Sequence, residues 1–320
     1  PEEDPPSDPD PPEEPVEDPE DPEEPPDPPD PEEPPVTGAI DPADVMVRLS
    51  ADEPFEAQAY QNQFTKPVYV DRDGTTMSFL RHVGALAEIH GSVLPNGETL
   101  RFGKENDPAN PSRKAFTMQI GPSDPTTGGS KRVEFGFSRN MEMNKWYWIG
   151  VRVFVHDWGT LTSGDQSLFG FQLHDGSGRD LSPTLALYSA GIGQRDMKIV
   201  TRYSTATAPT QSTSHNNDHA QQPIPFGSWF DVVARVRLNV SGQGRADVWL
   251  NGIQQVNYSG HLGFNEPEYK SFMKYGYYNW TGAFGSSGKS RKVRLRSPCL
   301  IFDPTGGKYT HQMIRSFLYT

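Results

Sequence analysis

Short strand-like segments follow one another along most of this chain, and they limit the folds that it can adopt. Trp146–Val155 is a continuous aromatic and β-branched run, and Phe230–Leu238 ends in alternating residues. Arg245–Leu250 leads into Asn251-Gly252, a dipeptide typical of two-residue hairpin turns, and Ile253–Val256 returns. Glycine and proline interrupt these segments, and no stretch shows long helical periodicity. The pattern predicts an antiparallel β-sandwich with very little helix.

The first part of the chain has a composition that cannot form a core. Residues 1–35 contain 16 prolines and 17 acidic residues, with only Ser7 and Val16 besides. Mutual repulsion of the carboxylates and the stiffness of proline favour an extended polyproline II spacer. We therefore predict a disordered acidic proline-rich linker over residues 1–36 and a single domain over residues 37–320. Such a tether is common on exported modular enzymes, so we expect a secreted or extracellular monomer, attached to an upstream module or to a cell or virion surface.

Without the linker, the charge balance changes sign. The chain has 42 acidic and 29 basic residues, so removing the 17 acidic residues of the linker leaves 25 against 29, a net charge of +4. A mildly basic domain suits a polyanionic ligand, although ordinary scatter of charge explains the value equally well.

Nucleic-acid binding is not expected because no recognised motif is present, and no apolar run is long enough for a membrane span. Cys299 is the only cysteine, which excludes an intrachain disulfide, and we expect a buried, inert thiol.

Two segments combine strand alternation with reactive side chains. Gln172-Leu173-His174 is followed about a hundred residues later by Phe272–Asn279. In a strand, alternate residues share a face, so Gln172 lies beside His174, and Lys274 lies on the same face of its strand as Tyr278. An amide, an imidazole, an ammonium group and a phenol on one surface are suited to binding an acidic sugar and moving its protons.

These two motifs resemble the Gln-x-His and Tyr-Phe-Lys-x-Gly-x-Tyr motifs of the jelly-roll polysaccharide lyases, a group that includes alginate lyase, heparin lyase I and glucuronan lyase. Lys131–Phe135 is similar to the Arg-Ser-Glu-Leu-Arg strand of the same enzymes, with Arg132 and Glu134 at matching positions. Gly136 stands where the family has its second arginine, which argues against a standard alginate lyase. The block from Gly227 to Gly252 resembles concanavalin-like sandwiches. The resemblance implies a β-jelly roll.

The resemblance also implies an activity, the β-elimination of a glucuronan-, alginate- or glycosaminoglycan-like polysaccharide to unsaturated oligosaccharides. His174 and Tyr278 then move protons, in an order that the sequence leaves open, while Gln172 and Arg132 hold the substrate carboxylate. Further candidates for substrate contact are Lys274, Glu134, Asn279 and Arg139. No cofactor is certain. Calcium occurs in some relatives, but no loop of aspartate ligands can be assigned here.

Other readings remain open at this level. Arg132 with Glu134 suits a cross-strand salt bridge, His174 suits a structural histidine bonded to Asp175, and Tyr278 stands in a tyrosine-rich strand. A carbohydrate-binding module or a glycoside hydrolase on the same sandwich are alternative functions, although the usual Glu-x-Asp-x-x-Glu string of such hydrolases is absent.

Several polar segments have no assigned place. Thr205–Gln222 reads as a long surface loop, within which His215 and His219 are a weak metal candidate. The basic residues near the C-terminus suit either a subsite for polymer charge or a solvated strand face; they are Lys289, Arg291, Lys292, Arg294 and Arg296. Residues that could contact the polymer, but that alternation does not place, are His90, Arg152, His156, Arg202 and Tyr203.

Overall fold

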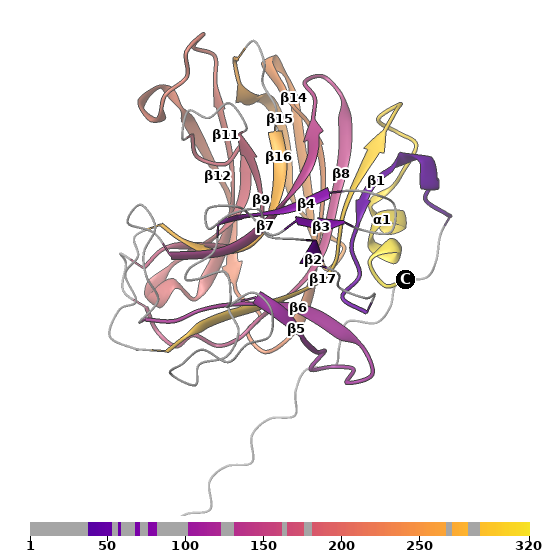
Figure 1. The fold of residues 1–320 in the computed structure, drawn as a ribbon. Coiled ribbons are helices and arrows are strands. Elements are labelled where there is room, and N and C mark those ends of the chain that lie inside the picture. Colours follow the sequence, from indigo (N-terminus) through magenta and orange to yellow (C-terminus); the bar gives the residue numbers. More distant parts are fainter. Residues whose placement is uncertain are drawn as a thin grey trace, which may run out of the picture.

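The structure is a computed structural model in which strands account for most of the described chain (Figure 1). The described residues are 38–52, 57–58, 68–70, 76–81, 102–122, 131–161, 165–175, 181–266, 271–280 and 289–320. For residues 57–58, 68–70, 76–81, 102 and 135–140 the description covers the backbone only. The predicted linker over residues 1–36 lies outside the described residues.

One sheet is built around the long strand β17. Its neighbours are ordered β5–β6–β17–β8–β13–β14–β15, and β1 pairs with the second half of β17. The strands are β1 (Val45–Arg48), β5 (Phe102–Asn106), β6 (Lys114–Ile120), β8 (Trp146–Val155), β13 (Trp229–Arg237), β14 (Asn239–Leu250), β15 (Ile253–Phe264) and β17 (Arg291–Asp303). All of these pairs are antiparallel, as the hairpin signals predicted.

The second sheet is ordered β2–β3–β4–β7–β16–β9–β10–β11–β12, again with antiparallel neighbours. A short parallel contact between β11 and β15, at Tyr203 and Gly263, joins it to the first sheet. The strands are β2 (Ala57–Gln58), β3 (Val68–Val70), β4 (Thr76–Arg81), β7 (Lys131–Met141), β9 (Ser167–Asp175), β10 (Leu185–Ala190), β11 (Asp196–Ser204), β12 (His215–Pro223) and β16 (Ser271–Asn279).

The hairpin at Asn251-Gly252 and the low helix content are both confirmed. Asn251 has φ 48° and Gly252 has φ 80°, the positive pair that a type I′ turn between β14 and β15 requires. Within the described ranges the helical elements are three 3₁₀ turns and one short helix: η1 (Pro42–Asp44), η3 (Ile192–Gln194), η4 (Gln211–Thr213) and α1 (His311–Phe317). None of these helices has the length and apolar character needed to cross a membrane. The predicted all-β jelly-roll class is confirmed.

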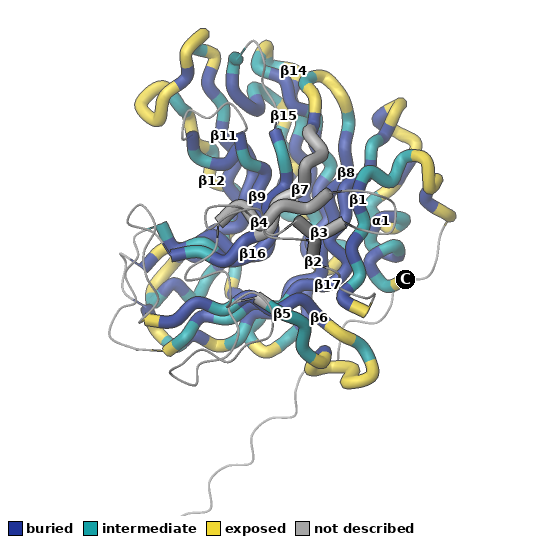
Figure 2. Tube along the Cα trace, viewed as in Figure 1, coloured by how far each residue is buried: buried dark blue, intermediate teal, exposed yellow. Residues whose placement is uncertain are grey.

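The core lies between the two sheets, and Figure 2 shows the buried residues along the strands that enclose it. Tyr275 of β16 donates its hydroxyl to the Cys299 carbonyl of β17 at 3.1 Å, and the Trp158 ring packs edge-on against Tyr277. Met273, Tyr275 and Tyr277 are fully buried, so these odd positions of β16 point into the sandwich. By alternation the even positions point to the outer face of the second sheet. This division decides which side chains can meet a polymer.

The predicted surface loop over Thr205–Gln222 is wrong from His215 onward, because these residues form the strand β12. This strand pairs with β11 from Asp196↔Pro223 to Tyr203↔His215. It is exposed or half-buried throughout, so it carries none of the apolar alternation by which strands are recognised. His215 stacks on Tyr203, and His219 Nε2 lies 2.8 Å from Thr201 Oγ1. The described residues contain no metal-binding cluster of histidine, cysteine, aspartate or glutamate.

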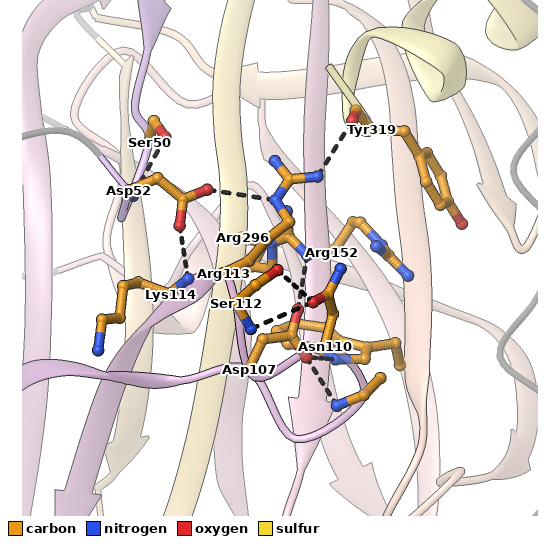
Figure 3. A network of polar contacts seen from close by, with 12 residues as sticks. Ser50, Asp52, Asp107, Asn110, Ser112, Arg113, Lys114, Arg152, Arg296 and Tyr319 are labelled. Atoms are coloured by element: carbon orange, nitrogen blue, oxygen red, sulfur yellow. Dashed lines mark hydrogen bonds and ion pairs between the residues drawn. The ribbon is translucent and has the colours of Figure 1, made fainter.

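Four of the basic residues near the C-terminus, from Arg291 to Arg296, belong to β17, and each contacts a carboxylate. Arg291 is fully buried beside Asp165, and Lys292 and Arg294 both contact Glu105 at 2.6 Å. Arg296 contacts Asp107 at 2.6 Å within the polar network of Figure 3. These pairings favour the structural interpretation of the cluster over a polymer subsite.

Cys299 is buried as expected. Burial raises the pKa of its thiol to about 12, which keeps it protonated and inert at neutral pH.

Candidate active site

Three neighbouring strands bring the motif residues onto one face. β16 lies between β7 and β9, with Lys274 opposite Gln172 and Tyr278 opposite Arg132. His174 lies opposite Phe272 at the end of the same face. The residues are therefore side by side although more than a hundred positions separate the first from the last.

Gln172 and Glu134 meet across β16, where Gln172 Nε2 donates to Glu134 Oε1. The strand between them carries Gly276, which has no side chain to block the contact. Gly276 has φ +146°, and a Cβ placed on it would collide with the Val133 carbonyl oxygen. The backbone geometry at this position of the motif therefore requires glycine.

The Gln172 and Glu134 side chains are nearly removed from solvent, each with 2% exposure. Among the described residues, Glu134 Oε2 and Gln172 Oε1 have no hydrogen-bond partner. The amide of Gln172 has two N–H donors, of which Glu134 accepts one, so a second remains for a ligand. Buried polar atoms without partners are uncommon in folded proteins, and here they mark a polar site.

Arg132 and Tyr278 form a stacked pair at the other end of the face. The guanidinium carbon lies 3.9 Å from the centroid of the Tyr278 ring, which is cation–π contact distance. Both side chains are half-buried. The Tyr278 hydroxyl has no hydrogen-bond partner within the described part of the chain, so this geometry leaves it available to a ligand.

The imidazole of His174 is held in one tautomer. Its Nδ1 lies 2.6 Å from the Asp175 backbone carbonyl oxygen, and a carbonyl only accepts, so Nδ1 carries the proton. In the neutral ring Nε2 is then an acceptor. The ring packs against Phe272 with centroids 5.5 Å apart. The bond to Asp175 is therefore compatible with a reactive histidine, because it leaves the other ring nitrogen able to take a proton.

The remaining three candidates have different positions. Lys274 is 6% exposed on the same face, with Nζ 5.6 Å from the Phe272 ring centroid. Asn279 is fully buried and alternates onto the inner face with Tyr277, so the structure does not bring it together with the others. Arg139 lies in β7, and its side chain is outside the described residues.

Sequence reasoning did not place Tyr188 and Trp280, which adjoin Tyr278, or Arg202, which contacts Tyr188. Tyr188 of β10 pairs in register with Leu168, which in turn pairs with Tyr278. Trp280 follows β16, and its ring lies 5.5 Å from Tyr188 and 6.3 Å from Tyr278. Arg202 of β11 donates from Nη1 to the Tyr188 hydroxyl at 2.6 Å. Burial raises the pKa of Tyr188, against the opposing effect of Arg202.

The other unplaced residues lie elsewhere or are not described. Arg152 pairs with Asp231 in the first sheet, and Tyr203 stacks between His215 and His261. The ring of His156 packs at a tilt against Phe154, and its pKa is lowered to about 4 by burial and by nearby Arg294 and Lys292. His90 lies outside the described residues.

The fold and the site together define a jelly roll with an arginine, an amide, an imidazole and a phenol on one outer sheet face. The sequence profile described as polysaccharide lyase matches residues 87–294, well over half of the chain. The chain therefore belongs to the polysaccharide lyase family, and this membership makes it an enzyme of that class. No curated protein sequence gives a significant match.

Solved structures of lyases are similar to the chain at low sequence identity. The endo-β-1,4-glucuronan lyase from the fungus Trichoderma reesei is similar with a TM-score of 0.50 and 13% identity, over 69% of this chain and 94% of that one. The marine alginate lyase AlyA1 from Zobellia galactanivorans gives 0.43 and 12%, over 75% and 96%. The alginate lyase Aly36B, in complex with an alginate trisaccharide, gives 0.42 and 11%, over 80% and 98%.

Proposed function

We propose that this polysaccharide lyase cleaves a uronic-acid-containing polymer by β-elimination. The observation that carries the proposal is the register of β7, β16 and β9, which gathers Arg132, Gln172, His174 and Tyr278 on one face. These four groups supply the functions that elimination needs: a carboxylate neutraliser, a base and an acid.

Neutralising the carboxylate is the first requirement. The hydrogen on the carbon next to a uronate carboxylate is too weakly acidic to remove unless the growing negative charge is offset. Arg132 supplies a permanent positive charge, and the second N–H of Gln172 supplies a directed hydrogen bond. Glu134 fixes the amide of Gln172 in this orientation. Because the charge grows as the proton leaves, these contacts strengthen in the transition state.

Two proton transfers complete the reaction. His174 Nε2, the acceptor nitrogen of the tautomer that Asp175 fixes, takes the proton from the carbon next to the carboxylate. A carbon–carbon double bond forms as the bond to the glycosidic oxygen breaks. Tyr278 gives its hydroxyl proton to that leaving oxygen. One product ends in a conjugated unsaturated uronate and the other in a free hydroxyl, so protons and electrons balance.

The chemistry predicts a specific optical signal. Elimination creates a double bond conjugated to the carboxylate, so each cleavage raises ultraviolet absorbance, whereas hydrolysis does not. The measurement is a panel of glucuronan, alginate blocks, heparin-like polymers and hyaluronan, followed by absorbance and by reducing-end assay. New reducing ends without absorbance would replace the lyase proposal with a hydrolase, and binding without any cleavage would favour a carbohydrate-binding module.

Arg132→Ala is expected to lower kcat/KM by about 10²–10³-fold, with both a higher KM and a lower kcat, because the guanidinium acts on the bound substrate and on the transition state. Initial rates over a range of polymer concentrations separate the two constants. Arg245→Ala is the matched control, since Arg245 pairs with Asp247 in the first sheet. Normal kinetics in Arg132→Ala would assign the neutraliser to another group.

A further inference from the structure

Arg202 is held rigidly on the same outer face as Tyr278. It lies in β11 and is 9% exposed. Its Nε donates to Asn216 Oδ1 at 2.6 Å, and its Nη1 donates to the Pro183 carbonyl at 3.0 Å and to the Tyr188 hydroxyl at 2.6 Å. Three acceptors from three segments therefore fix the plane of one guanidinium.

All of these acceptors are neutral, which is unusual for a cation so far removed from water. No carboxylate within the described residues forms an ion pair with Arg202, whereas the buried Arg152, Arg291 and Arg296 each contact an aspartate. Buried charges are normally paired, because an unpaired charge is costly to remove from water. The hydrogen bonds that Arg202 makes within the described part of the chain come from Nε and Nη1, and none comes from Nη2. The hydrogen bonds therefore fix the guanidinium in position, but no anion among the described residues neutralises its charge.

The position of Arg202 separates it from the reacting carboxylate. Its guanidinium bonds to Tyr188 on β10, and β9 lies between β10 and β16. Two strand spacings place β10 about 10 Å from the backbone that carries Tyr278. An apolar cluster lies between them, in which Tyr278 and Trp280 are partly exposed and pack on the buried Leu168, Ala186, Tyr188 and Val200. A chain of sugar rings that passes over this cluster would reach Arg202 with a sugar beside the one that reacts.

We propose that Arg202 binds the carboxylate of a second uronate, one that flanks the reacting uronate in the polymer. Tyr188 and Asn216 are positioning residues that hold the guanidinium, and Trp280 with Tyr188 supports the sugar ring that carries this second carboxylate. This inference rests on the proposed function and adds a requirement to it. The preferred substrate has a negative charge on a sugar close to the cleaved bond as well as at it.

Arg202→Gln is the direct test, measured on a length series of uronate oligosaccharides from the shortest that the enzyme cleaves to the polymer. A charge-assisted hydrogen bond to the flanking carboxylate corresponds to a rise in KM of about 10–100-fold on long substrates, with kcat changed by only a small factor. On the shortest substrate, which cannot fill both positions, the variant and the parent enzyme should have similar KM values. Arg202→Lys should recover part of the loss, since it keeps the charge without the planar fork.

The controls separate failure of this inference from failure of the proposed function. Arg195→Gln removes an arginine that pairs with exposed Asp157, and it should have normal KM at every length. Tyr188→Phe removes only the hydroxyl that orients Arg202, so a smaller rise in KM with the same length dependence is expected, even if Arg202→Gln does not fold. An unchanged KM in Arg202→Gln, or an equal rise at all lengths, overturns the second subsite while leaving elimination intact.

Binding measurements cover the case in which no elimination occurs. Calorimetric titration with the longest oligosaccharide should show weaker binding to Arg202→Gln than to the parent protein. If the parent protein binds but does not cleave, the proposed function fails while the subsite is still supported by this difference. If the parent protein neither binds nor cleaves any uronate oligosaccharide, both proposals are wrong.

Discussion

Tyr278→Phe is expected to lower the rate of elimination by about 10²–10⁴-fold while leaving polymer affinity nearly unchanged. The substitution removes one hydroxyl, and that hydroxyl has no hydrogen-bond partner among the described residues. The ring can therefore keep its stacking on Arg132, 3.9 Å from the guanidinium carbon, so the binding surface should persist. Turnover is measured by ultraviolet absorbance, and affinity is measured by calorimetry with an oligosaccharide.

Tyr309→Phe provides the matched control, because it also removes one tyrosine hydroxyl. Tyr309 donates to Asp44 at 2.5 Å and packs in a separate apolar cluster with Trp148 and Ile314, away from the outer face of the second sheet. It should have normal turnover and at most a small loss of stability. Full activity in Tyr278→Phe would mean that another group protonates the leaving oxygen, and a loss of affinity equal to the loss of rate would indicate a binding role instead.

The fold was predictable because its strands carry strong local signals. The run Trp146–Val155 coincides with β8, and Asn251-Gly252 forms the turn that its sequence requires. The residue pattern did not predict β12, because this strand lies at a sheet edge and both of its faces are partly exposed to water. Its pairing with β11 is specified by backbone hydrogen bonds and by contacts such as His219 with Thr201, and these leave no periodic pattern in the sequence.

The relative placement of the motif residues could be predicted only in part. Alternation correctly places Gln172 beside His174 within β9, but the register that sets Gln172 against Lys274, and Arg132 against Tyr278, comes from pairing between distant strands. Asn279 was predicted from its place in the motif, although a period of two already assigns it to the face opposite Tyr278. The roles of these residues stay predictions until the variants are measured.

Arg202 shows why the rest of the face could not be predicted from the sequence. Its partners Pro183, Tyr188 and Asn216 lie on three different segments, and no motif links them. What distinguishes Arg202 from the buried Arg152, Arg291 and Arg296 is that no carboxylate among the described residues pairs with it, a property of the folded chain. A sequence gives the number of charges, whereas only the structure shows which charges neutralise one another.

The first sheet depends on one such neutralised charge, Asp231. This carboxylate is fully buried in β13 and accepts from Arg152 Nε at 3.2 Å and from Arg315 Nε at 2.7 Å. It also accepts from the Tyr319 hydroxyl at 2.9 Å, and burial together with the Asp231 charge raises the pKa of Tyr319 to about 12, so the donor keeps its proton. Arg315 lies in α1 and Tyr319 comes just after this helix, so the hydrogen bonds to Asp231 connect the C-terminal helix to the first sheet.

Asp231→Asn is expected to lower the free energy of unfolding by about 3–5 kcal/mol, because it keeps the shape of the side chain but leaves Arg152 buried without its counter-charge. Urea denaturation, followed by tryptophan fluorescence, measures the loss.

Asp157→Asn is the matched control. Asp157 pairs with Arg195 on the surface with 56% side-chain exposure, so this substitution should change stability by about 0–1 kcal/mol. The folded Asp231→Asn protein should still eliminate at the parent rate, because Asp231 lies in the first sheet and the motif residues lie on the second. A loss similar to that of Asp157→Asn would show that water or a local rearrangement compensates Arg152, and that the C-terminal helix is held by its apolar contacts alone.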